Sequence, residues 1–425
     1  MIARWQWLLT QMTKRLWFRA SLFSVLGVMT ALIAIVLKDY IPVSLPGRIG
    51  ADAVDKILSI IASSMLAVTT FSLSTMVTAY GAASTGVTPR ATTLVMEDAT
   101  TQNALATFIG SFLFSLVGII ALSTGAYGTQ GRVVLFAVTI AVVILIVYTL
   151  LRWIDHLSKL GRVGETIDRV ETATINAIRH RVNLPYLGGS AYPPGLKLDP
   201  GSVSVLSRDV GYVQHIDVQA LALIAKKHLL QIYVEVLPGS FVHEGELIAR
   251  LLPSENAQTG DQECDTDPIL SAVTIGTRRT FEHDPRFGLS VLSEIASRAL
   301  SPAVNDPGTA IDVIGRGIRT FNAWAKPAHS ESSEIDCHNV HIRGLSLSDM
   351  FDDFFSPIAR DGAALLEVNI RLVKALASLA QTNPGLFGDL STHHIGIILE
   401  RADISLALEQ DKSRLKACVS QVADA

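Results

Sequence analysis

The chain has 425 residues and a formal net charge of −4, with only 17% charged residues against 49% hydrophobic ones. It carries no basic block or tail, which argues against nucleic acid as a partner. Its three cysteines are widely spaced and none belongs to a CxxC pair, so neither a zinc site nor a disulfide framework is expected. Unpaired thiols are typical of proteins in the reducing cytoplasm.

The first third of the chain contains four long uncharged runs, at residues 20–37, 57–89, 99–131 and 133–151. A helix needs about 20 mostly apolar residues to cross a bilayer, so each run can hold one crossing. The sequence therefore predicts a transmembrane domain over residues 1–155, formed by four helices. These are expected near residues 18–38, 57–80, 104–123 and 133–153.

Basic residues at the two ends of this domain predict its orientation, because lysine and arginine gather in the cytoplasm. Residues 1–19 carry four basic side chains and no acid, and six more follow between residues 152 and 181. The short loop at residues 124–131 has no charge. Both termini are therefore expected to be cytoplasmic in a multi-pass protein.

The second predicted span is unusually rich in hydroxyl groups, with nine serine or threonine residues between Ile57 and Tyr80. They could serve close packing of helices. They could instead line a polar path when several subunits assemble. The candidates for such a path are Ser59, Ser63, Thr70, Ser74 and Thr78. Apart from the end residues Arg19, Lys38 and Arg152, no Asp, Glu, Lys, Arg or His lies inside a span, which argues against a proton-driven carrier and favours a passive oligomeric pore.

A juxtamembrane helix and linker are predicted over residues 156–200. Apolar and small residues repeat there in a heptad seam that could join subunits or dock on the soluble region. A β module is expected at 201–268, because its strand signals alternate with turns. Residues 238–249 resemble part of the barrel-sandwich domains of lipoyl and biotinyl carriers. Those carriers need an exposed lysine at a hairpin tip, which is absent here, so no cofactor is expected.

The remaining residues, 269–425, are predicted to form a mostly helical cytoplasmic domain, which makes the whole chain an α+β membrane protein. Two Asp-Pro pairs, at 284–285 and 306–307, are typical helix starts. If the two turns meet, their polar neighbours could form a pocket. The pocket candidates are Arg278, Arg279, His283, Asp284, Asn305 and Asp306. The alternative is that both aspartates only cap helices.

Metal and catalytic sites are not predicted. The pair His393–His394 has no third ligand at a useful spacing. The acidic residues at 349, 352 and 353 suit the start of a helix without any metal. The chain also shows no nucleophile elbow, P-loop or dinucleotide fingerprint, so an enzyme is the least supported class.

Several segments together resemble a family of predicted bacterial membrane proteins, the domain of unknown function 2254. The most specific are R-T-F-E-H-D-P-R-F-G at 279–288 and A-L-S-P-A-V-N-D-P-G-T-A at 299–310; residues 58–65, 211–217 and 238–245 contribute as well. The resemblance extends from about residue 15 to 415. It implies a bacterial inner-membrane location and supplies no activity, and no catalytic residue is transferred from it.

Two functions remain open from the sequence. The first is an oligomeric passive channel or pore, gated by its cytoplasmic region. The alternative is a non-conducting membrane-anchored sensor or scaffold, whose soluble module binds a small ligand or a partner protein. The expected partners are the lipid bilayer and further copies of the chain.

Overall fold

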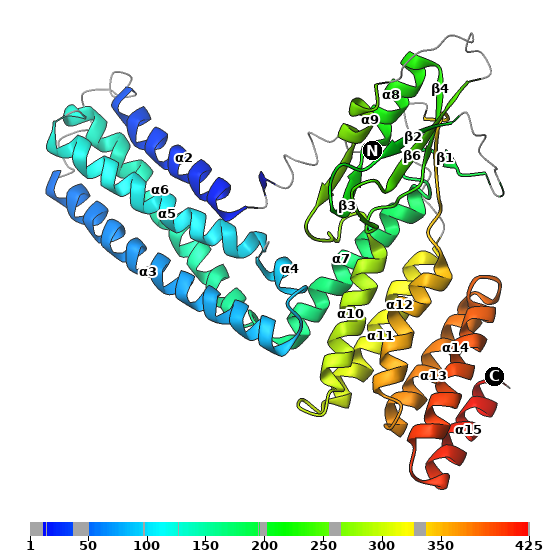
Figure 1. Ribbon diagram of the computed structural model, residues 1–425. Helices are drawn as coiled ribbons and strands as arrows, with labels where there is room; N and C mark the ends of the chain where they lie inside the picture. The colour runs from blue at the N-terminus through cyan, green and yellow to red at the C-terminus, as the bar shows by residue number, and fades with distance from the viewer. Residues whose placement is uncertain are drawn as a thin grey trace. The chain divides into compact units, whose positions relative to one another are not determined.

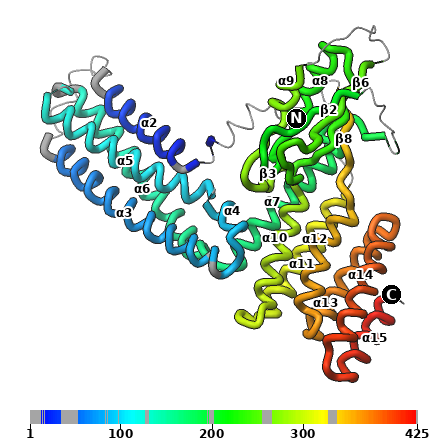
Figure 2. The backbone as a smooth tube through the Cα atoms, viewed as in Figure 1, coloured from blue at the N-terminus to red at the C-terminus, as the bar shows by residue number. Residues whose placement is uncertain are grey.

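The computed structural model describes residues 12–13, 15–36, 51–96, 98–125, 127–193, 195, 202–254, 265–326 and 337–423. These residues form two compact units, with the division between Thr166 and Ile167. We call the described residues up to 166 the N-terminal unit and those from 167 the C-terminal unit. Figure 1 shows the helices and strands of each unit, and Figure 2 traces the chain through them.

The N-terminal unit consists of helices. They are α2 (Leu16–Val36), α3 (Ala51–Gly86), α4 (Thr92–Met96), α5 (Ala99–Ser123) and α6 (Gly128–Leu157). Three segments of the described chain are long and apolar enough to cross a membrane, at 53–82, 92–123 and 131–157. The apolar part of α2, residues 17–33, is shorter. The end of the first predicted span, residues 37 and 38, lies outside the described residues. The structure thus supports three of the four predicted crossings.

Helix α5 packs against α2, α3 and α6 (Figures 1 and 2). Glycines permit the closest approach, since a Cβ atom added at Gly27 of α2 would lie 2.6 Å from the carbonyl oxygen of Gly110 in α5. A second link joins α6 to α3, where the Trp153 indole donates a hydrogen bond of 2.9 Å to the Ser72 hydroxyl. Small residues and hydroxyl groups therefore hold this unit together, as in many membrane helix bundles.

Helix α7 (Val163–Asn183) begins in the N-terminal unit and ends in the C-terminal unit. Its predicted seam is buried at Ile167, Val170, Thr174 and Ala177. In the C-terminal unit the seam docks on helix α10 (Pro285–Ala299), where a Cβ atom added at Gly288 would lie 2.1 Å from the Thr174 hydroxyl oxygen. Of the two alternatives for the seam, the structure shows docking within the chain.

Two small sheets form the β part of the C-terminal unit. One has the strand order β1-β8-β4-β6-β2, with β8 parallel to β1 and to β4. The other has the order β5-β3-β7 and is antiparallel. The strands are β1 (Ser190–Ala191), β2 (Val203–Leu206), β3 (Gly211–Ile216), β4 (Leu230–Val234), β5 (Phe241–Val242), β6 (Leu247–Pro253), β7 (Val273–Gly276) and β8 (Val340–Ile342). Helix α8 (Val218–His228) packs against β4, and their side chains share one apolar core.

The sheets differ from the predicted β module in two ways. Strands β1, β7 and β8 come from outside residues 201–268, because strand pairing joins segments far apart in the sequence. The barrel-sandwich architecture suggested by residues 238–249 is not confirmed, since this segment supplies β5 and part of β6 to two different sheets.

Helix α9 (Asp267–Ala272) packs against α8 and β7. The remaining helices pack side by side, and several of them enclose a phenylalanine core. They are α10 (Pro285–Ala299), α11 (Pro307–Trp324), α12 (Leu347–Asp361), α13 (Leu366–Thr382), α14 (Pro384–Ser405) and α15 (Glu409–Ala423). The core residues Phe321, Phe351, Phe354, Phe355 and Phe387 are fully buried. Both predicted Asp-Pro helix starts are confirmed, because Asp284 caps α10 and Asp306 caps α11.

Candidate functional site

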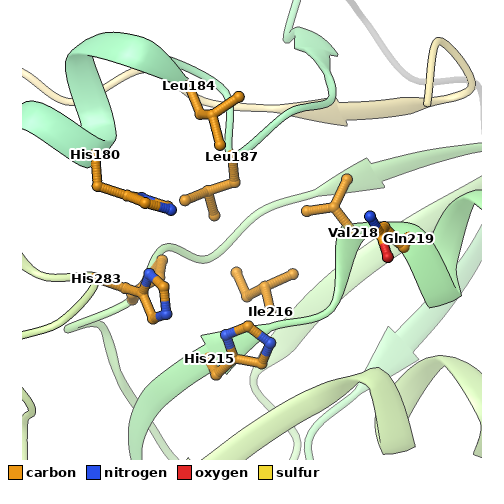
Figure 3. A pocket seen from close by; sticks show the side chains of 9 residues that line it. His180, Leu184, Leu187, His215, Ile216, Val218, Gln219 and His283 are labelled. Atoms are coloured by element: carbon orange, nitrogen blue, oxygen red, sulfur yellow. The ribbon is translucent and has the colours of Figure 1, made fainter. Parts of the chain in front are cut away.

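A small pocket in the C-terminal unit is lined by three histidines (Figure 3). It offers about 20 Å³ to the centre of a water-sized molecule, which is room for one such molecule or slightly more. The lining residues are His180, Leu184, Leu187, His215, Ile216, Val218, Gln219, Pro238 and His283. Figure 3 shows imidazole rings and aliphatic side chains surrounding the same space.

The three histidines come from three different elements. His180 lies in the last turn of α7, His215 in strand β3, and His283 in the turn before α10. The ring centroid of His283 lies 5.1 Å from that of His180 and 5.1 Å from that of His215. The pocket therefore exists only where the end of α7, the second sheet and the start of α10 come together.

Burial keeps His283 and His180 neutral at pH 7. It lowers the pKa of His283 to about 3, with a further lowering by the neighbouring His215 and His180 and an opposing effect of Glu282. Burial and the adjacent Arg181 also lower the pKa of His180. A neutral imidazole has one nitrogen that donates and one that accepts a hydrogen bond, so the pocket offers both kinds of group.

Arg181 is a buried cation next to the pocket. Its side chain is only 2% exposed, and Nη2 donates a hydrogen bond of 3.3 Å to the carbonyl oxygen of His283. Burial lowers the pKa of Arg181 to about 10, so the group remains a cation at neutral pH, and nearby Asp284 opposes the lowering. Within the described chain, neither Nη1 of Arg181 nor Nε2 of His283 has a hydrogen-bond partner.

Asp284 follows His283 in the chain and is buried, and both oxygens of its carboxylate accept hydrogen bonds. Its carboxylate accepts hydrogen bonds from Arg279 Nε at 2.7 Å and Arg279 Nη2 at 2.9 Å, and from the backbone N–H of Phe287 at 3.0 Å. Burial raises the pKa of Asp284, while the bonds from Arg279 lower it. The turn at Gly239 covers this carboxylate, because a Cβ atom there would lie 2.2 Å from Oδ2.

The structure brings together only part of the predicted pocket. His283 lines the pocket, and the ion pair of Arg279 and Asp284 follows it in the chain. The side chain of Arg278 is exposed, and its carbonyl oxygen accepts a hydrogen bond of 2.7 Å from the Gln214 side chain. Gln214 belongs to β3, so this bond ties the segment to the sheet.

Asn305 and Asp306 lie far from the others, and the two Asp-Pro turns do not meet. They stand at opposite ends of the 15-residue helix α10, roughly 22 Å apart at 1.5 Å per residue. Asp306 caps α11 by accepting bonds from the backbone N–H and the hydroxyl of Thr309, at 3.1 and 2.6 Å. Those bonds lower the pKa of Asp306, so capping explains this residue.

Three residues of the site are absent from the sequence prediction: His180, Arg181 and His215. His180 and Arg181 stand in the predicted juxtamembrane helix and His215 in a predicted strand. His215 lies 34 residues after Arg181 and 69 residues before Asp284. No motif joins them. The single local signal is the adjacent pair His180–Arg181 at the end of an otherwise amphipathic helix.

The five candidates for a polar path are all exposed on α3. The opposite side of α3 is buried at Leu58, Ile61, Met65 and Met76. Three of the hydroxyls donate to carbonyls of their own helix: Ser63 to Ser59, Thr70 to Ala67, and Thr78 to Ser74, at 2.9 to 3.0 Å. At 100° per residue, the positions 59, 63, 70 and 74 fall within about 60° of one another. They therefore form one outward face, which the packing of the described residues does not use.

Metal ligation finds no support in the described part of the chain, where no group of three or more histidine, cysteine, aspartate or glutamate side chains could hold an ion. His394 instead packs against Phe351 and Phe355. Asp349 and Asp353 accept hydrogen bonds from Arg286, each at 2.6 Å.

Comparison with known proteins agrees with the membrane character of the chain. A family model described as a predicted membrane protein, DUF2254, matches residues 13–378. Uncharacterized proteins of Mycobacterium bovis and Mycobacterium tuberculosis H37Rv are each 28% identical over 229 residues, which is 52% of this chain and 42% of each relative. The chain thus covers less than half the length of these relatives. No solved structure matches it.

Proposed function

The chain belongs to the DUF2254 family of predicted membrane proteins, and we propose that it is a membrane-anchored sensor. In this proposal a small ligand binds in the three-histidine pocket of the C-terminal unit and alters helix α7. The observation that carries it is the place of His180 and Arg181. Both belong to the last two turns of the helix whose first residues are part of the N-terminal, membrane-spanning unit.

The pocket has the properties of a binding site. Ligand sites combine apolar walls with a few polar groups that fix orientation, and titratable groups with shifted pKa values gather in them. Here aliphatic side chains surround three imidazoles, and the pKa values of two of these are lowered. A ligand that contacts His180 would act directly on α7, without any intermediate element.

Lysine and arginine counts support an orientation with both termini in the cytoplasm, and the family of predicted membrane proteins supports a location in the bacterial inner membrane. The C-terminal unit would then sample cytoplasmic solutes. Four crossings are part of this proposal, with α2 as the first, because an even number returns the chain to the side on which it began.

The test is a screen of small bacterial metabolites against the full-length protein in detergent, read by thermal shift and by hydrogen exchange of α7. We expect at least one compound that raises the melting temperature and slows exchange in the last turns of α7. His283→Phe fills the pocket and should abolish both effects. His243→Gln, in an exposed turn between β5 and β6, is the control and should respond like the wild type.

Compounds that bind equally well to the wild type and to His283→Phe would place the ligand elsewhere and contradict this assignment. A ligand that binds in the pocket without any change in α7 would show that the protein binds a small molecule, but it would contradict the sensor function.

A second candidate function is a passive oligomeric pore gated by the cytoplasmic region. The supporting observation is the outward hydroxyl face of α3 formed by Ser59, Ser63, Thr70, Ser74 and Thr78. In a homo-oligomer these faces could surround a common axis, where hydroxyls and backbone carbonyls would replace part of the hydration of a solute.

Ion flux through the purified protein in liposomes tests this second function. Flux that disappears when Ser63, Thr70 and Ser74 are replaced by leucine would support the pore. A matched control replaces the exposed apolar residues Ile60 and Phe71 by leucine and should leave flux unchanged. Folded protein without flux, together with a ligand response of α7, would favour the sensor.

A further inference from the structure

We propose that the three-histidine pocket binds a small monovalent anion, of the size of chloride or formate, close to His283 and Arg181. This inference rests on the proposed sensor function and names the chemical class of its ligand. It follows from the charges around the pocket, from its unsatisfied polar atoms and from its size.

The charge around the pocket is unevenly balanced. The carboxylate of Asp284 is hydrogen-bonded to Arg279, whereas for Arg181 it is only a nearby opposite charge. Arg279 holds that carboxylate in a two-point contact, and the N–H of Phe287 takes a further position on it. Arg181 therefore has no carboxylate in hydrogen-bond contact among the described residues. A buried charge without a close partner is costly.

The other charged groups near the cluster do not remove this imbalance. The charge of Arg286 lowers the pKa of Asp284 without a hydrogen bond between them, and Arg286 itself forms ion pairs with Asp349 and Asp353. The charge of Glu282 raises the pKa of His283, but Glu282 is not among the residues that line the pocket. None of the lining residues, all within the described ranges, carries a carboxylate. An anion in the pocket would meet the dipoles of neutral imidazoles and no carboxylate in its wall, with the positive charge of Arg181 next to it.

Unsatisfied polar atoms point to the same ligand class. His283 is 7% exposed, lines the pocket, and leaves Nε2 without a partner in the described chain. The neutral imidazole can carry its proton on this nitrogen and donate it to an anion. Hydrogen bonds to a charged acceptor are about twice as strong as neutral ones. The positive field of Arg181, in contact with the His283 backbone, would hold the same anion.

Size restricts the ligand further. The space of about 20 Å³ for the centre of a water-sized molecule admits one small solute. Chloride or formate fits this description, whereas sulfate or phosphate would have to displace side chains. A single charge also matches the single uncompensated guanidinium.

The experiment measures chloride binding to the full-length protein in detergent at pH 7. The ³⁵Cl NMR line width is recorded while sodium gluconate is replaced by sodium chloride at constant ionic strength, because gluconate is too large for the pocket. We expect excess line broadening that added sodium formate removes. Saturating chloride should also raise the melting temperature by about 3 °C, since a ligand that binds only the folded state stabilises it.

Arg181→Met keeps the length of the side chain and removes its charge, so the excess line width should fall about tenfold. His180→Gln, which retains a polar group of similar size, is the second variant and should weaken binding less; it keeps the test informative if Arg181→Met does not fold. His243→Gln should broaden the line like the wild type. Without chloride, Arg181→Met should be at least as stable as the wild type, because it removes an unpaired buried charge.

If the wild type shows no excess line broadening, or if Arg181→Met shows the same broadening as the wild type, the proposed anion site is contradicted. Binding of Zn²⁺ at the three histidines without competition from chloride would also overturn it and indicate a metal site. If chloride has no effect but an uncharged metabolite binds to the wild type and not to His283→Phe, the sensor function is supported and only the proposed ligand class is wrong. If chloride binds and α7 does not respond, the anion site stands and the sensor fails.

Discussion

At the scale of single residues, His283 shows how burial couples the site to pH. Its side chain is 7% exposed and its pKa is lowered to about 3, chiefly by burial. In the unfolded chain the pKa returns to about 6.5. The unfolded state therefore takes up the proton more readily, and the free energy of unfolding falls as the pH drops from about 6.5 to about 3.

The predicted loss is about 1.4 kcal/mol for each pH unit in that window, and about 2 kcal/mol between pH 6.5 and 5. His180 adds to the loss, because its pKa is lowered too. In His283→Gln the stability of the C-terminal unit should depend less steeply on pH. Thermal unfolding followed by circular dichroism at pH 7, 6 and 5 measures both slopes. Equal slopes in the wild type and the variant would show that His283 is not held neutral by the fold.

Gly239 illustrates a second effect of a single residue. Its φ of +96° is unfavourable for a side chain, and a Cβ atom would overlap the Asp284 carboxylate at 2.2 Å. Gly239→Ala should lower the free energy of unfolding by more than about 2 kcal/mol, since backbone strain and a displaced carboxylate add together. Gly245→Ala is the matched control, because its φ is +82° and the space around it is open.

The control should cost about 1 kcal/mol, from backbone strain alone. Denaturant titration of both variants gives the difference. A Gly239 variant that is no less stable than the Gly245 variant would show that Asp284 can move away from the turn without cost.

At the scale of elements, helix α7 is held to α11 by a network of charges. Arg316 of α11 donates hydrogen bonds to Asp168 and Glu171 of α7 and to Asp312 of its own helix. Arg319 adds two bonds to Glu171, at 2.6 and 2.9 Å. Both Arg316 and Glu171 are less than 10% exposed. This network fixes the first turns of α7 in the C-terminal unit, and the histidine pocket lies at its last turns.

Arg316→Ala should therefore destabilise the C-terminal unit by about 3 kcal/mol, because it leaves a buried carboxylate with fewer partners. It should also speed hydrogen exchange in the first turns of α7. Arg360→Ala removes an exposed pair with Asp361 and should cost less than about 1 kcal/mol. Exchange in α7 that is the same in both variants would show that the network does not hold the helix.

At the scale of the whole molecule, the number of crossings decides on which side each end lies. Four crossings leave both ends on one side, whereas three place them on opposite sides. Fluorescent proteins that fold only in the cytoplasm, fused separately to each end, should both be bright in cells. An alkaline phosphatase fusion after Thr124, behind the third predicted crossing, should be active outside the cytoplasm. Fluorescence at one end only would reduce the crossings to three.

The sequence by itself determined those features of this protein that depend on neighbouring residues. Apolar runs of about 20 residues predict the membrane helices at 57–80, 104–123 and 133–153, and long apolar helices occupy these positions. The Asp-Pro pairs predict the starts of α10 and α11, because capping involves residues only three positions apart. The family likeness, carried by contiguous motifs, is confirmed in the same way.

Only the tertiary structure decided which distant segments meet. It joined β8 to β4 across about a hundred residues and placed His180 and His215 beside His283. It also separated Asp306 from Asp284, although the two turns resemble each other in sequence, because the helix between them is straight and 15 residues long. Helix caps and apolar runs are local and are therefore readable in order along the chain. A pocket depends on packing between elements, which no local pattern specifies.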